Sequence, residues 1–542
     1  MIWNTNGRIL HFACTALVLS QAAQANGAQP GLVWSYEMPN ETYSNYSVSI
    51  GDGGSQVFTD TGKSTRYTRL FSSTETGTVA PQWEASSADH AYYQLVASAE
   101  TNDRHFTLYQ KDDPAGSNDR FATLEAYRSN SSQPAWSYGF PVPIYNHDRM
   151  MVECSRDGSV VAVVIENVYN SGEEVYIFDG TGGQPLHFQA NMAGWFKYGR
   201  LSDDGSTLYL NSESRVKLFD TSTGNELHSM TVFGGTYTGH AISADGRVFA
   251  FSRGGGAVAY SRDASGVYAL DTNITGSSTE YVNSLALSSN GEVLVLGFSD
   301  AVLNRARVQV VRRTPTSTTG TTLLDQSYQG SLASGSYTNW PRDISMSASG
   351  DRFAVAFTGD GLIGTNTPEL VVFERQWSGL ASSPYQVLED WNCVGSRMEL
   401  DLSADGNHLA VSGRDTHASS SFGTKVIEYY HLGADLMLTG TPRPGQELTV
   451  EFHATTGPRA YLLVTDRAYE NPIMTSAGPL LLDRSNGLTV FELDNVGVDG
   501  IARGQFLLDT QDYQAGDRLY FQAYSAGPRR LCRTMQSLTL LP

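Results

Sequence analysis

One short pattern recurs along this chain and limits its fold more than any other feature. Apolar residues alternate into a Ser, a turn ending in Gly follows, most often as Asp-Gly, and a second alternating segment begins. Alternation of period two predicts strands with one buried face, and a turn glycine supplies the positive φ of a tight hairpin. The pattern occurs six times, with glycines at Gly158, Gly205, Gly246, Gly291, Gly350 and Gly406.

The spacing of these hairpins, from 41 to 59 residues, predicts a repeat architecture. Repeats of this length with four short strands are typical of propeller blades. Two degenerate copies precede the six, at Ser47–Gly54 and at Tyr93–Ser98. Counting both predicts an all-β chain with an eight-bladed β-propeller over residues 31–433, and seven blades with one long insertion is the alternative.

The two ends of this region predict how the ring closes. The last repeat has no outer strand before Gly433, whereas Leu32–Tyr36 reads as an outer strand with no blade of its own. Pairing the two would remove exposed strand edges, so we expect the N-terminal strand to complete the last blade.

Residues 434–542 change character, with short alternating strands such as Glu447–Phe452 and no helical period. They predict a small β-sandwich after the propeller.

The N-terminal residues predict export. Arg8 precedes an apolar run over residues 9–19, and Ala23-Gln24-Ala25 fits a cleavage site. We therefore interpret 1–25 as a signal peptide and 26–433 as the propeller. The apolar run is too short to span a bilayer. A membrane anchor that is retained in the mature protein is the alternative to a cleaved signal peptide. No later segment predicts a membrane span. The expected location is secreted, periplasmic or at the cell surface.

Cysteine and charge content exclude several classes of protein. After cleavage Cys154, Cys393 and Cys532 remain, so at most one disulfide can form, and the sequence leaves open which two would pair. Lys plus Arg number 36 against 56 Asp plus Glu, a net charge of -20. Such a surface repels phosphates, which excludes nucleic acid as a partner.

A search for catalytic motifs predicts no catalytic, cofactor-binding or metal-ligating residue. Neither G-x-S-x-G nor H-E-x-x-H occurs, and His240 after Gly239 is interpreted as a structural hydrogen-bonding residue. Adjacent acids on one strand point to opposite faces, so such pairs cannot flank a glycoside. Asp204 is instead expected to bond turn amides. The pairs are Asp112-Asp113, Glu173-Glu174 and Asp203-Asp204.

No cofactor is predicted from the residues, apart from the alternative of a structural calcium. Loops rich in Asp, Asn and Gly, at Gly359–Gly361 and Asp494–Gly500, carry the oxygen ligands that calcium prefers. Neither loop has EF-hand spacing.

The S-x-D-G unit with its following strand resembles the WD40-like (PD40) repeats of secreted bacterial propellers. The turn Phe219–Gly224 and the strands carrying Trp34, Trp83 and Trp136 resemble quinoprotein (PQQ-like) repeats. That resemblance implies a Trp that docks one blade on the next. It also implies a quinone cofactor. Two observations argue against this cofactor: most blades lack the docking Trp, and the vicinal cysteine pair is absent. The C-terminal region resembles the sandwich modules appended to secreted bacterial proteins.

These observations predict a monomeric, non-catalytic propeller that binds a protein or a glycan at the cell envelope, because recognition residues concentrate on loops of rigid scaffolds. An extracellular polymer hydrolase or lyase, with its site in the central channel, is the alternative. Acids clustered with an Arg or a Tyr at one channel mouth would favour the enzyme, and small apolar and hydroxyl residues would favour the binding module.

Overall fold

The computed structural model describes residues 32–541 with gaps. The gaps are 39–46, 62–64, 74–76, 88–90, 102, 113–119, 145–149, 168–171, 193–195, 213, 233–238, 301, 315–316, 331–338, 360–367, 376–384, 392, 394, 415–424, 433–434, 440–441, 454–458, 467, 476–477, 483–488, 494–500, 509–513, 526–529 and 532–535. No helix long and apolar enough to cross a membrane is found in these described residues.

Seven four-stranded antiparallel sheets follow one another along the described chain, and in each of them the strands pair in chain order from the inner to the outer strand. The first three are β2 (Val48–Gly51), β3 (Gln56–Thr61), β4 (Arg66–Ser72) and β6 (Trp83–Ser87); β7 (Ala91–Ser98), β8 (Arg104–Asp112), β9 (Arg120–Arg128) and β10 (Ser131–Pro143); and β11 (Met151–Cys154), β12 (Val160–Asn167), β13 (Gly172–Asp179) and β14 (Pro185–Met192). A 3-10 turn, η1 (Asp52–Gly54), joins β2 to β3.

The next four sheets repeat this organisation. They are β15 (Phe196–Leu201), β16 (Thr207–Ser212), β17 (Arg215–Asp220) and β18 (Glu226–Thr231); β19 (His240–Ile242), β20 (Val248–Arg253), β21 (Gly256–Arg262) and β22 (Tyr268–Thr275); β23 (Glu280–Leu287), β24 (Val293–Asp300), β25 (Arg305–Thr314) and β26 (Ser317–Gln329); and β27 (Pro341–Met346), β28 (Arg352–Phe357), β29 (Leu370–Arg375) and β30 (Tyr385–Trp391).

The N-terminal strand closes the last sheet, as predicted. β31 (Arg397–Leu402), β32 (His408–Arg414) and β33 (Lys425–His431) are followed by β1 (Leu32–Met38), and β5 (Gly77–Thr78) adds to β1. β1 pairs with β33 antiparallel, with Trp34 opposite Tyr429. The predicted hairpins are likewise confirmed, including the degenerate pairs β2–β3 and β7–β8.

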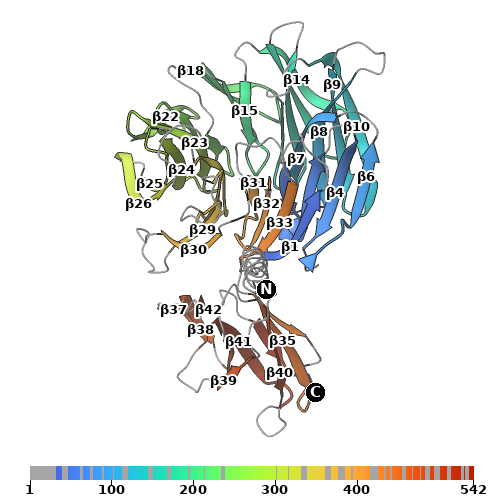
Figure 1. Cartoon of the computed structure of the whole chain (residues 1–542), viewed down its shortest axis with the longest axis vertical. Helices are drawn as coiled ribbons and strands as arrows, with labels where there is room; N and C mark the ends of the chain where they lie inside the picture. The colour runs from blue at the N-terminus through green and yellow to red at the C-terminus, as the bar shows by residue number, and fades with distance from the viewer. Residues whose placement is uncertain are drawn as a thin grey trace, which may run out of the picture.

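The sheets are arranged in a circle (Figure 1). Each first strand, from β2 to β31, contacts the first strand of the following sheet, and β31 contacts β2. Within the described residues the circle therefore contains eight sheets, with their first strands around a central axis.

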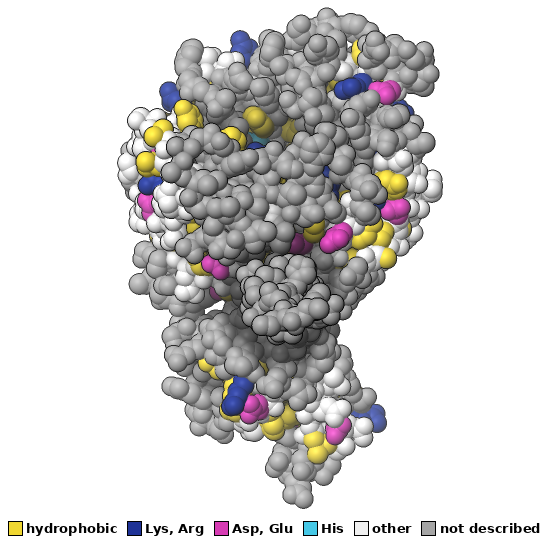
Figure 2. All heavy atoms as spheres, in the orientation of Figure 1, with side chains coloured by type: hydrophobic (Ala, Val, Ile, Leu, Met, Phe, Trp, Pro, Cys, Tyr) yellow, Lys and Arg dark blue, Asp and Glu magenta, His cyan; other side chains and the backbone are white. Residues whose placement is uncertain are grey.

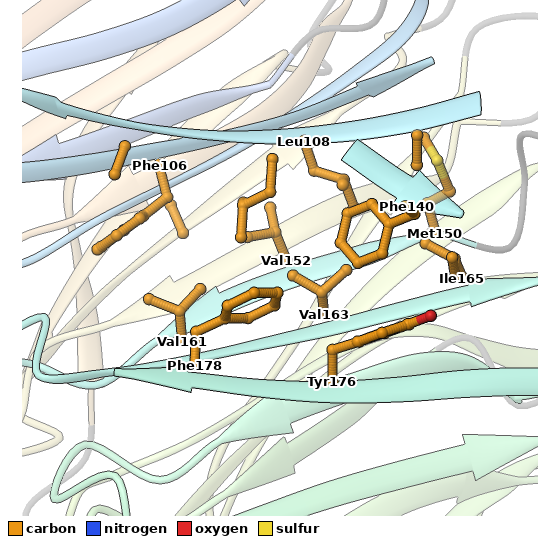
Figure 3. Close-up of a cluster of buried hydrophobic side chains, with 14 of the residues drawn as sticks. Phe106, Leu108, Phe140, Met150, Val152, Val161, Val163, Ile165, Tyr176 and Phe178 are labelled. Carbon is orange, nitrogen blue, oxygen red and sulfur yellow. The ribbon is translucent and has the colours of Figure 1, made fainter. Parts of the chain in front are cut away.

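Apolar side chains fill the space between neighbouring sheets. Between the sheets of β8 and β12, Figure 3 shows Phe106 and Leu108 facing Val161, Val163 and Phe178. All five are fully buried. Burying a side chain of this size stabilises a fold by about 1.5–3 kcal/mol, so alternation along each strand accounts for the packing of the ring.

Aromatic side chains also dock sheets on one another, as the quinoprotein resemblance implies. The indole N–H of Trp83 donates to the Ser129 carbonyl (2.9 Å), and that of Trp136 donates to the Gly180 carbonyl (3.2 Å). In the next sheet, which lacks a Trp, His187 Nε2 lies 2.8 Å from the Ser222 carbonyl. A histidine thus takes over the docking position.

The C-terminal region forms separate sheets. One contains β34 (Asp435–Thr439), β35 (Glu447–His453) and β40 (Ile501–Leu507); another contains β39 (Thr489–Glu492), β36 (Ala460–Thr465), β41 (Arg518–Ser525), β42 (Arg530–Leu531) and β43 (Gln536–Thr539); β37 (Ala468–Thr475) pairs with β38 (Gly478–Leu482). The first two share one core that includes Val450, Phe506 and Phe521.

Candidate binding site in the axial channel

The recurring turns form one end of the channel, and their sequence explains their geometry. In the copy at Ser202, the Ser202 hydroxyl donates to Asp204 Oδ1 (2.7 Å) and accepts from the Thr207 N–H (2.9 Å). Asp204 also accepts from the Ser206 N–H (2.9 Å), and Gly205 has a φ of 70°. The predicted turn role of Asp204 is confirmed. The same bonds recur in the copies beginning at Ser155, Ser243, Ser288 and Ser403.

The residues between Ser and Asp in these turns link one sheet to the next. The Arg156 N–H donates to the Asp203 carbonyl (2.8 Å), the Ala244 N–H to the Ser289 carbonyl (2.9 Å) and the Ala348 N–H to a carbonyl in the next turn, that of Ala404 (2.8 Å). Because these bonds join neighbouring sheets around the axis, they fix the width of this end of the channel.

Glu100 completes the linkage where the first repeat is degenerate. Its carbonyl accepts from the Gly53 N–H (2.5 Å), while its carboxylate accepts from the Ala404 N–H and lies 3.0 Å from the Arg156 guanidinium. The carboxylate thus connects the second sheet directly to the last one. Burial raises the pKa of Glu100.

Two neighbouring cavities lie along the axis. The narrower, of about 230 Å³, lies at the turns and is lined by Glu100, Arg156 and Asp203 among others. The wider, of about 740 Å³, lies between the first strands, and Cys154 and Asp401 line both. A volume of this size is in the range of ligand pockets.

Most charged side chains of the wider cavity bond neighbouring strands. Glu153 on β11 pairs with Arg200 on β15 (2.6 Å). Asp343 on β27 accepts from the Leu400 N–H (3.0 Å), and Asp401 on β31 accepts from the Ile50 N–H (2.8 Å). These carboxylates therefore hold the ring together as well as lining it.

Glu399 differs from the other acids of the cavity. Among the described residues, no hydrogen bond or ion pair to its carboxylate is found, although Arg342 lines the same cavity. Burial, reinforced by the negative charge of Asp343, raises the pKa of Glu399 to about 7. Burial likewise raises the pKa of Asp401 to about 7, against the hydrogen bond from Ile50.

His240 and Cys154 also line the wider cavity. His240 Nε2 lies 3.2 Å from the Gly199 carbonyl, which agrees with the structural role predicted for it, and its ring also lines the cavity. Burial raises the pKa of Cys154 well above its ordinary value, so the thiol is not activated as a nucleophile. Cys154 and Cys393 do not pair with each other, and Cys532 lies outside the described residues.

The acid pairs singled out in the sequence are not assembled into one site. Asp112 is exposed and 3.8 Å from Arg120, and Glu174 accepts from the Tyr176 hydroxyl (2.6 Å). Asp203 does line the narrower cavity. Asp113 and most of both candidate calcium loops lie outside the described residues, and no group of metal-ligating side chains is found within them.

The charged residues of the channel were missed, although the sequence contains a signal for them. Glu153, Arg200 and Asp401 each stand two residues before the Ser of a recurring turn, and Asp343 and Glu399 stand four before it. With a period of two, these positions share one strand face, and all five residues line the wider cavity.

Comparisons with known proteins support the fold. No family model matches the chain, and no curated protein matches it. The structure is similar to that of Sqt1 from Chaetomium thermophilum, with 14% identity, a TM-score of 0.50, and coverage of 74% of this chain and 99% of that one.

Two further solved structures give lower scores. A second structure of Chaetomium thermophilum Sqt1 has 14% identity, a TM-score of 0.48, and coverage of 74% and 98%. The Cps50 (Swd1) β-propeller domain of Myceliophteria thermophila has 13% identity, a TM-score of 0.40, and coverage of 62% and 95%. At these identities the likeness concerns the fold alone. The likeness to the first of the two Sqt1 structures, together with the circle of antiparallel sheets, identifies the chain as an all-β protein with a β-propeller fold.

Proposed function

We propose that this protein is a non-catalytic, eight-bladed β-propeller that binds a protein partner, and that it acts outside the cytoplasm with its C-terminal β-sandwich as an accessory module. The observation that carries the proposal is the state of the channel acids. Glu153, Asp343 and Asp401 already bond neighbouring strands, so they position the ring. A rigid ring with a ligand-sized opening suits recognition.

The surface supports a protein partner over a polyanion. The net charge is -20. On the face seen in Figure 2, acidic and basic side chains are interspersed among the coloured residues. The proposed export and the proposed location at the cell envelope rest on the N-terminal residues 1–25. A glycan is the other class of ligand to be tested.

Cross-linking followed by affinity purification tests this proposal. The bait is residues 26–542, compared with residues 26–433, in envelope and culture-supernatant fractions. We expect one reproducible protein partner, and its loss with the shorter bait would assign docking to the C-terminal module. Enrichment of no protein over an unrelated bait would contradict the proposal. Mass spectrometry of the exported protein should give Asn26 as the first residue.

A second candidate function is the hydrolysis or cleavage of an extracellular polymer in the channel. The clustering of Glu399, Asp343, Arg200, Arg342 and Tyr198 in one cavity favours it, by the criterion stated above. Glu399 and Asp401 are two residues apart on one strand, which separates their Cα atoms by about 6.5–7 Å. Inverting glycosidases separate their carboxyl groups by roughly 6.5–9.5 Å.

The hydrogen bonds of Asp401 argue for binding over catalysis. A general base must be available to water, whereas the Asp401 carboxylate accepts from the Ile50 N–H and the Ser49 hydroxyl (3.2 Å). Reducing-sugar release and unsaturated-product absorbance should therefore stay at background on neutral and acidic polysaccharides. Turnover that is abolished by Glu399→Gln would establish the enzyme instead.

A further inference from the structure

Four exposed large hydrophobic residues lie at the end of the propeller opposite the recurring turns. Tyr281 at the start of β23, Val302 and Leu303 between β24 and β25, and Trp340 just before β27 are all exposed large hydrophobic residues. Val302, at 68%, is the most exposed of those found among the described residues. We call these four residues the apolar tip patch. Tyr and Trp are enriched among residues that dominate binding energy.

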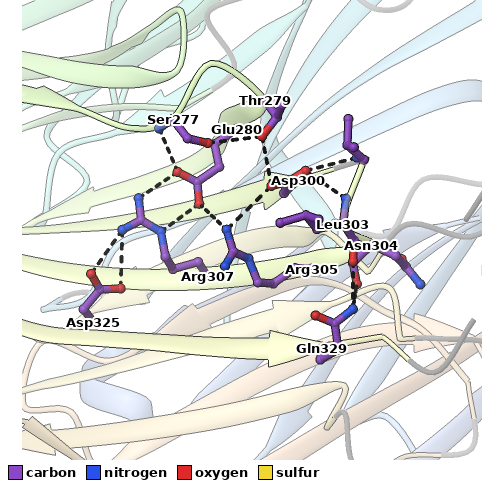
Figure 4. A network of polar contacts seen from close by, with 11 residues as sticks. Ser277, Thr279, Glu280, Asp300, Leu303, Asn304, Arg305, Arg307, Asp325 and Gln329 are labelled. Carbon is purple, nitrogen blue, oxygen red and sulfur yellow. Dashed lines mark hydrogen bonds and ion pairs between the residues drawn. The ribbon is translucent and has the colours of Figure 1, made fainter. Parts of the chain in front are cut away.

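The backbone beneath this patch is held in one conformation. Asp300 Oδ1 accepts from the N–H groups of Val302 and Leu303, at 3.0 Å each. Gln329 Nε2 donates to the Leu303 carbonyl (2.7 Å), and Asn304 adopts a φ of 46°. Figure 4 shows these contacts together. Presenting apolar side chains on a fixed backbone lowers the entropy lost on binding.

A buried ionic network supports Asp300 from below. Thr279 Oγ1 donates to Asp300 Oδ2 (3.0 Å), and Arg305 lies 3.6 Å from the same carboxylate. Arg305 and Arg307 both contact Glu280, at 3.3 and 3.0 Å (Figure 4). Glu280 and Asp300 are almost completely buried. The charges are therefore used to hold the turn, while its exposed surface stays apolar.

The apolar tip patch and the wider cavity share one end of the ring. Trp340 is two residues before Arg342, which lines the cavity, and the Asn339 N–H donates to Asn304 Oδ1 (3.4 Å) across the two sheets. A single extended segment could thus contact the patch and enter the cavity.

The charge of the cavity indicates what such a segment carries. Four carboxylates line the wider cavity, those of Glu153, Asp343, Glu399 and Asp401, against the guanidinium groups of Arg200 and Arg342. Of the four, Glu399 is the one without a hydrogen bond to the described residues. A second copy of this chain is a poor occupant, because two chains of charge -20 repel each other.

We propose that this end of the propeller docks a basic segment of a protein partner, with an apolar side chain packed on the apolar tip patch and a Lys or Arg side chain paired with Glu399 in the cavity. The proposal rests on the binding function proposed above and names the partner's chemistry.

The titration of Glu399 predicts how the affinity for a basic segment changes with pH. The groups that act on it are Asp343, which raises its pKa, and Lys425, Arg200 and Arg342, which lower it, so that with burial the pKa is about 7. An ionised Glu399 attracts a cation and a protonated one does not. Binding of a basic segment should therefore strengthen as the pH rises from 6 to 8.

Defined peptide pools test the proposal on the full chain. Three fluorescent nonapeptide pools are compared by anisotropy, composed of Leu, Lys and Gly, of Leu, Glu and Gly, and of Ser, Lys and Gly. We expect the Leu-Lys pool to bind at least tenfold more tightly than either other pool. Glu399→Gln and Val302→Ser should each weaken that binding about tenfold, and Glu399→Gln should remove its dependence on pH.

Two matched variants control for general effects. Glu226→Gln removes an exposed acid on β18, and Leu186→Ser removes an exposed aliphatic side chain on β14. Both should bind the Leu-Lys pool like the unmodified chain, and circular dichroism should show all four variants folded. Equal binding of the three pools, or a loss shared by the controls, would overturn the proposal.

The outcome also separates this proposal from the one on which it rests. If a partner is captured by cross-linking and its yield is unchanged by Glu399→Gln and Val302→Ser, the binding function stands and this surface is wrong. If no partner is captured and no pool binds, both are wrong.

Discussion

At the scale of single residues, the recurring turns combine two demands that only glycine meets. Gly246 has a φ of 67°, and a Cβ there would collide with Thr207 of the preceding sheet. Gly254 has a φ of 56°, but a Cβ there would meet no atom within 4 Å. The turn glycine thus provides both the hairpin conformation and the close approach of two sheets.

Gly246→Ala should destabilise the protein by about 2–4 kcal/mol, because backbone strain adds to overpacking. Gly254→Ala, which introduces strain alone, should cost about 1–2 kcal/mol. Guanidinium unfolding monitored by tryptophan fluorescence measures both. Equal losses for the two variants would show that the contact with Thr207 contributes nothing.

Stability should increase as the pH falls from 8 to about 5. The pKa values of Glu399 and Asp401 are raised to about 7, so the folded state takes up protons before the unfolded state does and gains stability as the pH falls from 8. Burial lowers the pKa of His105 to about 3, so below about 6.5 the unfolded state takes up a proton that the folded state refuses. This one group offsets only part of the gain from the two carboxyls, so stability still rises below pH 6.5, but less steeply.

Urea unfolding at pH 8, 6.5 and 5 checks this expectation. Between pH 8 and 6.5 the gain should be on the order of 1 kcal/mol. The double variant Glu399→Gln, Asp401→Asn should lose this gain, while Glu226→Gln keeps it. Greater stability at pH 8 than at 6.5 in the unmodified chain would be incompatible with the assignment.

At the scale of elements, strand β1 is held in the ring by its aromatic contacts as well as by its backbone. Trp34 is 1% exposed, stacks on Tyr429 at 5.5 Å between ring centroids and lies 5.1 Å from Phe71 of the first sheet. One side chain therefore joins the last sheet to the first.

Trp34→Ala should cost about 3–5 kcal/mol of unfolding free energy. Trp340→Ala, at an exposed site, should cost less than about 0.5 kcal/mol. Differential scanning calorimetry compares the two variants. A small loss for Trp34→Ala would mean that the backbone pairing of β1 alone closes the ring.

The hairpins and the closing strand were predictable because each depends on local pattern: alternation, a turn glycine, and an outer strand lacking a blade. The channel chemistry was not, because it depends on which strands meet around the axis. Nothing adjacent to Glu100 indicates that its carboxylate reaches Ala404. The apolar tip patch also joins residues of two sheets.

At the scale of the whole molecule, the propeller and the C-terminal sheets have separate cores. Phe521 packs with Phe506 at 5.6 Å between ring centroids, in a cluster formed only by residues from 448 to 540. Phe353 and Phe373 belong to a propeller cluster. Neither core draws its members from the other region.

Calorimetry of the full chain should therefore show two transitions. Phe521→Ala should lower one of them and Phe353→Ala the other, each by about 3–5 kcal/mol for the affected unit. Residues 26–433 alone should keep the propeller transition. A single transition that both variants shift together would show that the two regions unfold as one unit.

The pairing of β1 with β33 has a consequence for the order of folding. Of the described strands, β1 leaves the ribosome first, and it finds its partner β33 only after the last sheet of the ring has been made. Contacts between such distant segments slow folding, so ring closure should be a late, slow step. Until then both edges of the open ring are exposed. A chaperone or export factor that recognises unpaired strands would therefore have its longest opportunity to act where β1 and β33 meet.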